Sequence, residues 1–244
     1  MSSKQSSMLR RGFRMAISIL SLGVSMSAFE VFGSDGDSWK EEVLLHDGTK
    51  LIVQRSQSYG GRHEIGQRPP IKEHTITFTL PSTNRPITWT SEYSEDIGRT
   101  NFNLLAVHLL EGTPYIVASP NLCLSYNKWG RPNPPYVFFK YDNKVWQRIP
   151  LEIVPVEFKT INVALDIRGR QVEGLASLGL VSSEKIKELN QHTTIPEFKT
   201  ILREPVKSGT AGSSVNCIEL VQYKGSWIMP NDPVMRRLLD QQTK

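Results

Sequence analysis

Short apolar runs separated by polar breakers dominate the middle of the chain. Aromatic and β-branched side chains are concentrated at residues 115–118, 122–126, 136–141 and 145–149, and runs rich in Ser, Asn, Pro and Asp separate them. Short runs of this composition, bounded by turn residues, are typical of antiparallel strands. The pattern therefore predicts an antiparallel meander across residues 112–155.

The first part of the chain shows two further strand patterns. The run VLLHDGTKLIVQR places Asp47 and Gly48 between two apolar arms, which is typical of a hairpin with a tight turn. In residues 74–80, Ile76, Phe78 and Leu80 alternate with threonines, which predicts a strand with one solvent-facing side. Residues 102–110 fit neither period, and we interpret them as a strand that forms a hairpin with residues 115–118.

The second half of the chain contains weaker strand patterns and two helical ones. Strands are predicted at residues 160–167, 198–203, 215–223 and 227–229. A helix is predicted at residues 183–190, where Ser182 or Ser183 can cap the first turn, and another at residues 232–241, where Asp232 precedes Pro233. The fold class that follows is mainly β (β-rich α+β), an antiparallel meander or sandwich-like assembly with at least seven strands and only these two short helices.

One short motif occurs twice. The sequence EFKTI at residues 157–161 recurs at residues 197–201, but the flanking residues do not repeat. A repeat architecture needs matching flanks. We interpret the two copies as a coincidence or as two equivalent strands of one sheet.

The first 33 residues resemble an export signal in their three-part pattern. A basic stretch is followed by the apolar run MAISILSLGVSMSAF and then by small residues, so cleavage is expected after Ser27 or Gly33. An uncleaved anchor is the alternative, but the apolar run is shorter than the roughly 20 residues of a membrane-spanning helix. The sequence predicts a signal peptide at residues 1–33 and one β-rich globular domain at residues 39–244, without a transmembrane span in the mature protein.

The position of the charges argues against a nucleic-acid partner. The chain has a formal net charge of +5, but its first 33 residues carry four basic residues and one acidic residue, so the remainder carries only +2. A nucleic-acid-binding surface needs basic residues clustered on the mature protein. We therefore expect no nucleic acid among the partners.

Two cysteines follow the predicted signal peptide, Cys123 and Cys217, each within an apolar run. An oxidising compartment would allow them to form a disulfide, whereas buried thiols behave as small apolar side chains. Spacing alone leaves both possibilities open. No CxxC pair or Cys/His ligand pattern occurs, so we expect neither a metal nor another cofactor.

Two loops carry the candidate ligand-binding residues. The first supplies Tyr59, Arg62, His63 and Glu64 beside two glycines, where His and Glu could take part in acid–base chemistry or bind a ligand. A solvated loop with an incidental histidine explains the same residues.

The second loop, residues 127–136, supplies Trp129, Arg131 and Asn133 on a proline-rich backbone. An aromatic platform with amide donors suits sugars, although Trp129 could instead pack under the sheet. We predict that this loop approaches the first one and completes a pocket with it.

A third cluster, Glu92, Glu95 and Asp96, could bind a hard cation or supply paired carboxylates for glycoside hydrolysis, although a polar turn is the simpler interpretation. No GxSxG, P-loop or GxGxxG motif supports an enzyme. We therefore expect a periplasmic or secreted, non-enzymatic protein that presents loops to a ligand or an envelope partner. The alternatives are a hydrolase that uses loop carboxylates, including Glu64, and an envelope-associated structural subunit.

Overall fold

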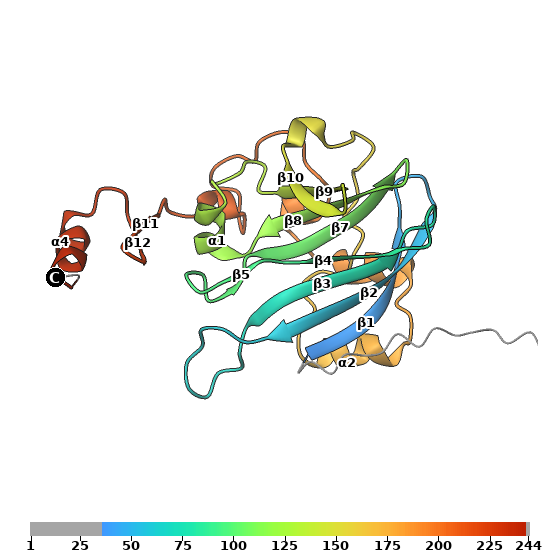
Figure 1. The fold of residues 1–244 in the computed structure, drawn as a ribbon, viewed down its shortest axis with the longest axis horizontal. Coiled ribbons are helices and arrows are strands. Elements are labelled where there is room, and N and C mark those ends of the chain that lie inside the picture. Colours follow the sequence, from blue (N-terminus) through green and yellow to red (C-terminus); the bar gives the residue numbers. More distant parts are fainter. Residues whose placement is uncertain (1–35, 243–244) are drawn as a thin grey trace, which may run out of the picture. The chain divides into compact units, whose positions relative to one another are not determined.

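The computed structural model describes residues 36–242, so the leader and both expected cleavage sites lie outside the described residues. Strands account for 36% of the residues and helices for 20%, which confirms the mainly β, α+β class. The described residues form two antiparallel sheets of four strands each and two small two-stranded pairs, and Figure 1 shows how the larger sheets are arranged. The prediction of at least seven strands is therefore confirmed.

The first sheet, called sheet 1, has the strand order β1-β2-β3-β4. Its strands are β1 (Gly36–Leu44), β2 (Lys50–Tyr59), β3 (Ile71–Thr79) and β4 (Pro86–Thr90). The turn between β1 and β2 contains Gly48 at a φ of +83°, a conformation that glycine adopts without steric cost. The predicted hairpin is confirmed, and the threonines of β3 lie on its less buried side as expected.

The second sheet, called sheet 2, has the order β10-β9-β8-β7. It consists of β7 (Phe102–Leu110), β8 (Thr113–Pro120), β9 (Val137–Asp142) and β10 (Val145–Ile149). The predicted hairpin between residues 102–110 and 115–118 is confirmed, because β7 pairs with β8 in antiparallel register. The short pair β5 (Tyr93–Ser94) and β6 (Arg99–Thr100) precedes β7.

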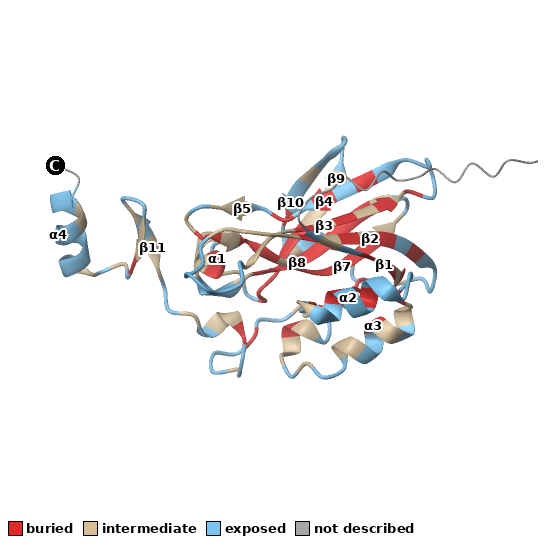
Figure 2. Cartoon of the chain, turned by 90° about the horizontal axis from the view of Figure 1, so that it is seen from below, coloured by how far each residue is buried: buried red, intermediate tan, exposed pale blue. Residues whose placement is uncertain are grey.

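A shared apolar core joins the two sheets. It contains Val53 and Ile76 from sheet 1 and Val107 and Ile116 from sheet 2, all fully buried. Figure 2 shows the buried residues concentrated along the strands and on parts of the helices that cover them. The arrangement agrees with the sandwich-like assembly expected from the alternation.

The prediction of a strand at residues 122–126 is wrong, because this segment is the helix α1 (Leu122–Lys128). Its apolar residues at alternating positions give this segment the sequence pattern of a strand. Ser125 instead donates a hydrogen bond from its hydroxyl to the carbonyl of Asn101, and Tyr126 is buried beside it. These tertiary contacts override the local pattern.

A second helix was also missed. The helix α2 (Arg170–Ser177) buries Val172 and Leu175 and packs against β1. The adjacent Arg-Gly-Arg sequence at residues 168–170 indicated a chain break, and Gly174 weakens the helical pattern. The predicted helices are confirmed as α3 (Ser183–Asn190), with Ser182 as its side-chain cap, and α4 (Pro233–Gln242).

Three predicted strands in the second half are wrong or too long. Residues 160–167 are irregular, with bends at Val163 and Asp166, and form only one isolated bridge, Thr160 to Thr200. The strand predicted at residues 198–203 begins instead at the end of a 3-10 helix, η2 (Pro196–Phe198). The strand predicted at residues 215–223 is too long. Its first residues belong to a second 3-10 helix, η3 (Ser214–Asn216), and only β11 (Val221–Tyr223) is a strand. The strand predicted at 227–229 is β12 (Ser226–Ile228).

The two EFKTI copies contact each other. The antiparallel bridge joins Thr160 of the first copy to Thr200 of the second, and the amide of Ile201 donates to the carbonyl of Lys159. The interpretation as two equivalent strands of one sheet is therefore wrong, because the copies meet through one isolated bridge and neither belongs to a sheet.

Candidate functional site

The alternation of side chains along the strands places several polar residues on the core-facing side of sheet 1. On β2, Leu51 and Val53 face the core, and the same alternation continues through Arg55 and Gln57, which are each 2% exposed. On β1, Glu41 lies two residues before Val43, on the same face of the strand, and is fully buried. One end of the inner face is therefore apolar and the other is polar.

A buried ion pair forms the centre of this polar end. Nη1 of Arg55 lies 3.2 Å and 3.3 Å from the two carboxylate oxygens of Glu41. The indole Nε1 of Trp39 also donates to Glu41, at 2.6 Å, and the Arg55 guanidinium lies over the Trp39 ring. Buried charges need such partners, because an unpaired charge in the interior is costly.

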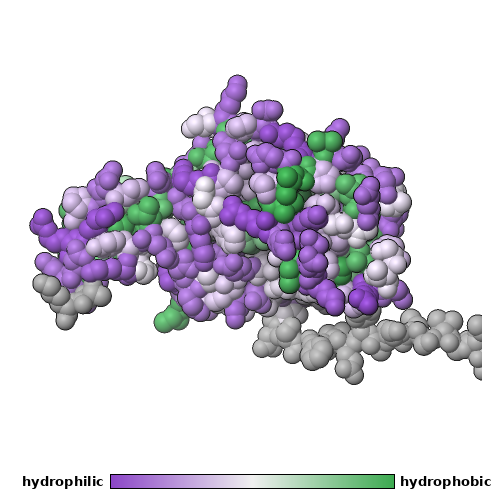
Figure 3. Space-filling model, turned by 45° about the horizontal axis from the view of Figure 1, so that its top comes forward, coloured by the Kyte–Doolittle hydropathy of each residue, from purple (hydrophilic) through white to green (hydrophobic). Residues whose placement is uncertain are grey.

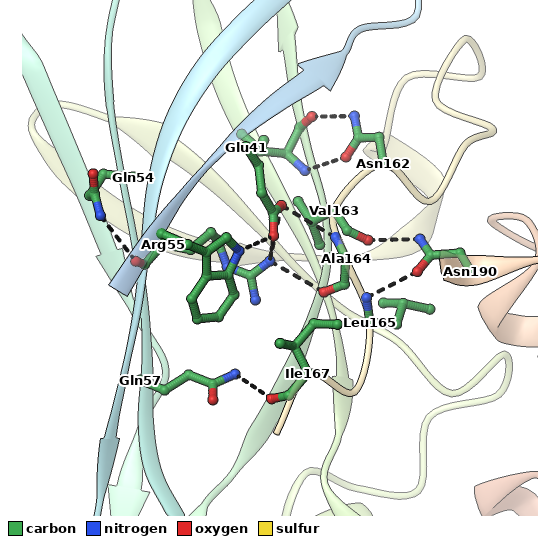
Figure 4. Close-up of polar contacts among 12 residues, drawn as sticks. Glu41, Gln54, Arg55, Gln57, Asn162, Val163, Ala164, Leu165, Ile167 and Asn190 are labelled. Carbon is green, nitrogen blue, oxygen red and sulfur yellow. Dashed lines mark hydrogen bonds and ion pairs between the residues drawn. The ribbon is translucent and has the colours of Figure 1, made fainter. Parts of the chain in front are cut away.

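The ion pair helps to hold residues 162–167, an irregular segment that crosses the polar end (Figure 4). Glu41 accepts from the amide of Ala164, and Arg55 and Gln57 donate to the carbonyls of Ala164 and Ile167. Asn190 of α3 adds two hydrogen bonds from the other side, to the carbonyl of Val163 and from the amide of Leu165. Side chains thus supply the partners that a neighbouring strand would otherwise supply.

Asn162 fixes the start of this segment. Its side chain exchanges two hydrogen bonds with the backbone of Val107 on β7, at 3.0 Å and 2.8 Å. It also donates to the carbonyl of Leu44 at the end of β1. One buried asparagine therefore ties the segment to both sheets.

A cavity of about 540 Å³ lies beside this segment, and we call it the interlayer cavity. Its polar lining includes Arg55, Gln57 and His74 from sheet 1. Its apolar lining includes residues from both sheets, from the covering segment and from the chain after α3, namely Ile71, Leu104, Leu165, Ile167, Ile195 and Phe198. A volume between about 300 and 1,000 Å³ is typical of small-molecule sites, and the lining here is divided about equally between polar and apolar residues.

His74 and Arg55 each keep a polar atom without a partner within the described residues. These atoms are Nδ1 of His74 and Nε of Arg55. His74 lies opposite Gln57 in the β2–β3 register, on the same face as Arg55. Burial lowers the pKa of His74 to about 3, with a smaller contribution from the positive charges of Arg55 and Arg168. The imidazole is therefore neutral at physiological pH.

Arg168 and Asp166 also line the cavity, but in exposed positions. Their side chains are 69% and 75% exposed and form an ion pair at 2.6 Å. The buried residues Arg55 and His74 thus lie deeper than this exposed pair.

A disulfide lies next to the cavity lining. Cys123 and Cys217 are bonded, with their Cα atoms 5.3 Å apart, so the pairing alternative is correct. Leu122, which precedes the first cysteine, and Ser214, which lies near the second, both line the cavity. The bond therefore attaches the chain after residue 212 to the start of α1.

The first predicted loop lies mostly at the surface. Tyr59 donates from its hydroxyl to Asp37, while Arg62, His63 and Glu64 are exposed. Arg62 contacts the backbone of residues 95 and 98 in the β5–β6 pair. None of these four side chains is among those that line the interlayer cavity.

The second predicted loop contacts the chain that follows η2. Arg131 donates to the carbonyls of Cys217 and Ile218, and Asn133 exchanges two hydrogen bonds with the backbone of Val206. Trp129 is partly buried against Phe102, with ring centroids 4.5 Å apart. A second hollow of about 480 Å³ includes Asn133 in its lining.

The two loops share a neighbour. Arg62 of the first loop and Lys128, just before Trp129, both contact the β5–β6 pair, and the ammonium of Lys128 lies 3.4 Å from Glu92 and 3.2 Å from Asp96. Ligand binding by these loops stays a prediction. Within residues 36–242, no three His, Cys, Asp or Glu side chains are grouped to hold a metal ion.

The residues of the interlayer cavity were missed although the sequence carries a signal for them. The alternation of Phe78 and Ile76 continues to His74, and that of Leu51 and Val53 continues to Arg55 and Gln57. Extending the period by one or two steps would have placed these polar residues on the core face. The usual exposure of Arg and Gln argued against it.

Comparisons with known proteins gave no match for this chain, either among protein-family models or among curated proteins and solved structures. The functional argument therefore rests on the geometry above. No helix in the described part of the chain is long and apolar enough to cross a membrane.

Proposed function

We propose that this chain is an exported, non-enzymatic protein that binds a small molecule in the interlayer cavity. The observation that carries the proposal is the combination of a cavity of about 540 Å³ with two deeply buried polar side chains, Arg55 and His74, that line it and keep an unpartnered atom. Buried polar groups without a partner are uncommon in folded proteins, and each one calls for an explanation such as a functional role or a bound water or ion.

The positions of the carboxylates support binding rather than hydrolysis. Glycosidases hold two carboxyl groups across a cleft, at separations of roughly 5 to 10 Å. Glu92 and Asp96 instead bind one ammonium, that of Lys128, and Glu64 is exposed on another loop. Partial burial opposes ionisation of Asp96, but the hydroxyl of Ser94 and the ammonium of Lys128 together lower its pKa, which suits a stabilising ion pair better than a general acid.

The disulfide supports the proposed location. Disulfides persist in oxidising compartments, such as the bacterial periplasm and the extracellular space, and are rare in the cytosol. The Cys123–Cys217 bond fits such a compartment. A periplasmic or secreted location is part of the proposal, together with the export signal.

The surface also bears on the alternative of an envelope structural subunit. The face in Figure 3 is mainly hydrophilic, with small apolar groups that are separated from one another. A subunit that assembles through this face would need a larger continuous apolar patch. The view therefore favours ligand binding over assembly for this face.

A matched pair of substitutions tests the proposal. Thr193 lines the cavity, whereas its neighbour Thr194 is exposed and does not. We expect Thr193→Trp to fill part of the cavity and to abolish the binding of small-molecule fragments found by ligand-observed NMR, and Thr194→Trp to leave it unchanged. Equal binding to both folded variants, or no binding to the unsubstituted protein, would overturn the proposal.

A further inference from the structure

None of the described residues of α4 (Pro233–Gln242) is buried, and Figure 2 shows this helix as mainly exposed. Together with β11 and β12 it forms the last part of the chain, residues 218–242, which we call the C-terminal arm. Five large apolar side chains of the arm are exposed, namely Ile218, Met229, Val234, Met235 and Leu238. Exposed apolar side chains that gather in one segment are typical of a surface that another molecule covers.

The helix α4 turns a charged side towards the β11–β12 pair. The guanidinium of Arg236 lies over the Tyr223 ring, 5.0 Å from its centroid, and donates to the carbonyl of Pro230. Asp240, one turn later, accepts from the Tyr223 hydroxyl at 2.7 Å and pairs with Lys224 at 2.8 Å. Residues four apart lie on the same side of a helix, so these contacts identify the side of α4 that faces the pair.

The apolar side chains of α4 therefore face away from the pair. Val234, Met235 and Leu238 form one stripe, because Leu238 follows the other two by four and three residues, and they are 65%, 38% and 46% exposed. Val234 and Leu238 each lie two residues from Arg236, which is about 200° around the helix. An amphipathic helix of a globular protein normally turns its apolar stripe to the core. The reverse orientation of α4 indicates that its stripe is covered in an assembly.

The base of the arm is held in place by the body. The Cys123–Cys217 disulfide directly precedes the arm. The side chain of Asn127 donates to the carbonyl of Ile218 and accepts from the amide of Leu220, both at 2.9 Å. A segment that is ordered before it docks loses less conformational entropy on docking. These contacts therefore suit the arm to the presentation of its stripe.

The charges of the arm favour a second copy of this chain as the molecule that covers the stripe. Residues 218–242 contain three basic and three acidic side chains, so their net charge is zero. Anionic lipid surfaces and nucleic acids attract segments with an excess of basic residues, which the arm lacks. Two neutral arms meet without net repulsion, and a two-fold contact between identical surfaces covers both stripes at once.

We propose that this chain forms a two-fold symmetric dimer through the C-terminal arm, in which Val234, Met235 and Leu238 of α4 pack against the same stripe of a second copy. The stripe spans little more than one helical turn, and contacts of this size are typical of transient complexes. None of residues 218–242 lines the interlayer cavity, so the dimer does not depend on the proposed ligand.

Sedimentation velocity of the disulfide-bonded protein, from micromolar to millimolar concentration, tests the proposal. We expect a reversible monomer–dimer equilibrium. Leu238→Glu keeps a good helix former in α4 and places a carboxylate on both stripes, whereas Ile65→Glu makes a matching change on a fully exposed loop. We expect Leu238→Glu to weaken the dimer by about a hundredfold or more, because each dimer loses two apolar contacts and gains two facing charges, and Ile65→Glu to leave it unchanged.

Two further measurements locate the contact and separate it from membrane binding. The amides of α4 should exchange more slowly with solvent as the protein concentration rises, and those of the loop around Ile65 should not. We expect no co-sedimentation with phosphatidylglycerol vesicles. A protein that stays monomeric throughout the range, or a folded Leu238→Glu variant that dimerises as tightly as Ile65→Glu, would overturn the proposal. A monomer that binds the vesicles through Leu238 would show that the stripe contacts lipid and that the second copy is wrong.

Discussion

The two ends of the inner face of sheet 1 are built by the same strands and differ in what covers them. At one end, Val43, Val53 and Ile76 pack against the apolar side chains of sheet 2. At the other end, Glu41 and Arg55 face residues 162–167, which form no strand. A sheet that covers the inner face needs only apolar contacts, because its backbone groups are paired within the sheet. An irregular segment that covers this face needs side chains that form hydrogen bonds with its backbone.

This difference also explains why a cavity lies at the polar end. Interdigitating apolar side chains fill the space between two sheets to a high packing density. An irregular segment held by discrete hydrogen bonds leaves gaps between its attachment points, and the interlayer cavity lies along this segment. The polar network therefore holds the segment in place, and it leaves Nε of Arg55 and Nδ1 of His74 without a hydrogen-bond partner among the described residues.

The largest expected effect comes from removing one partner of the buried ion pair. Glu41→Leu leaves the Arg55 charge buried without its carboxylate, so we expect a loss of about 3–5 kcal/mol in the free energy of unfolding. Urea denaturation monitored by tryptophan fluorescence measures it.

The control is the double variant Glu41→Leu/Arg55→Met, which removes both charges. We expect it to recover part of the loss, because the uncompensated charge is gone while the hydrogen bonds to Ala164 stay broken. A double variant as unstable as the sum of the single variants would show that the pair is not coupled.

Breaking the disulfide should affect the polar end more than the apolar end. The bond joins residues 94 apart in sequence, and disulfides typically contribute about 2–4 kcal/mol to stability, with more expected for longer loops. We expect Cys123→Ala/Cys217→Ala to lose this amount and to speed amide hydrogen exchange around residues 193–214 before β2 and β3 are affected. Uniform acceleration across both sheets would mean that the bond stabilises the whole fold without fixing the cavity lining.

The sequence predicted the sheets better than the site because their signals are local. The hairpin at Asp47 and Gly48 and the alternation of β3 need only neighbouring residues. The partnership of Glu41 and Arg55 depends on strand register, which pairs Trp39 with Arg55 and Glu41 with Val53. A sequence without register information offers no reason to bury either charge.

Other errors have the same origin. Residues 160–167 have the composition of a strand, but they are irregular, and side chains such as Arg55 and Asn190 pair with their backbone. The helix α1 depends on contacts with Asn101, which lies more than twenty residues earlier. Both outcomes were decided by tertiary contacts that no local window contains.

The neutral state of His74 predicts a pH dependence of stability. Its pKa is lowered from 6.5 to about 3 in the folded protein, so the unfolded chain binds a proton between these values and the folded protein does not. Stability is therefore complete above about pH 6.5 and decreases as the pH falls towards 3, by roughly 1.4 kcal/mol per pH unit for each such histidine.

His108 adds to this effect, because burial lowers its pKa to about 4. Between pH 6.5 and 5, above the range in which most carboxylates titrate, we expect His74→Gln to reduce the slope of unfolding free energy against pH by about half. Urea denaturation at several pH values measures the slope. An identical slope in the variant would mean that His74 is protonated in the folded protein.

The smallest expected effect concerns the attachment of residues 162–167 to α3. Asn190 makes two hydrogen bonds with this segment, whereas the neighbouring Gln191 is exposed and makes none with it. We expect Asn190→Ala to lower the free energy of unfolding by about 1–2 kcal/mol, because it leaves a buried carbonyl and an amide without partners, and Gln191→Ala to change it little. The amide of Leu165 should then exchange faster while those of β2 keep their protection. If Asn190→Ala leaves this amide protected, the ion pair of Glu41 and Arg55 holds the segment without help from α3, and the polar end is stiffer than the comparison with the apolar end implies.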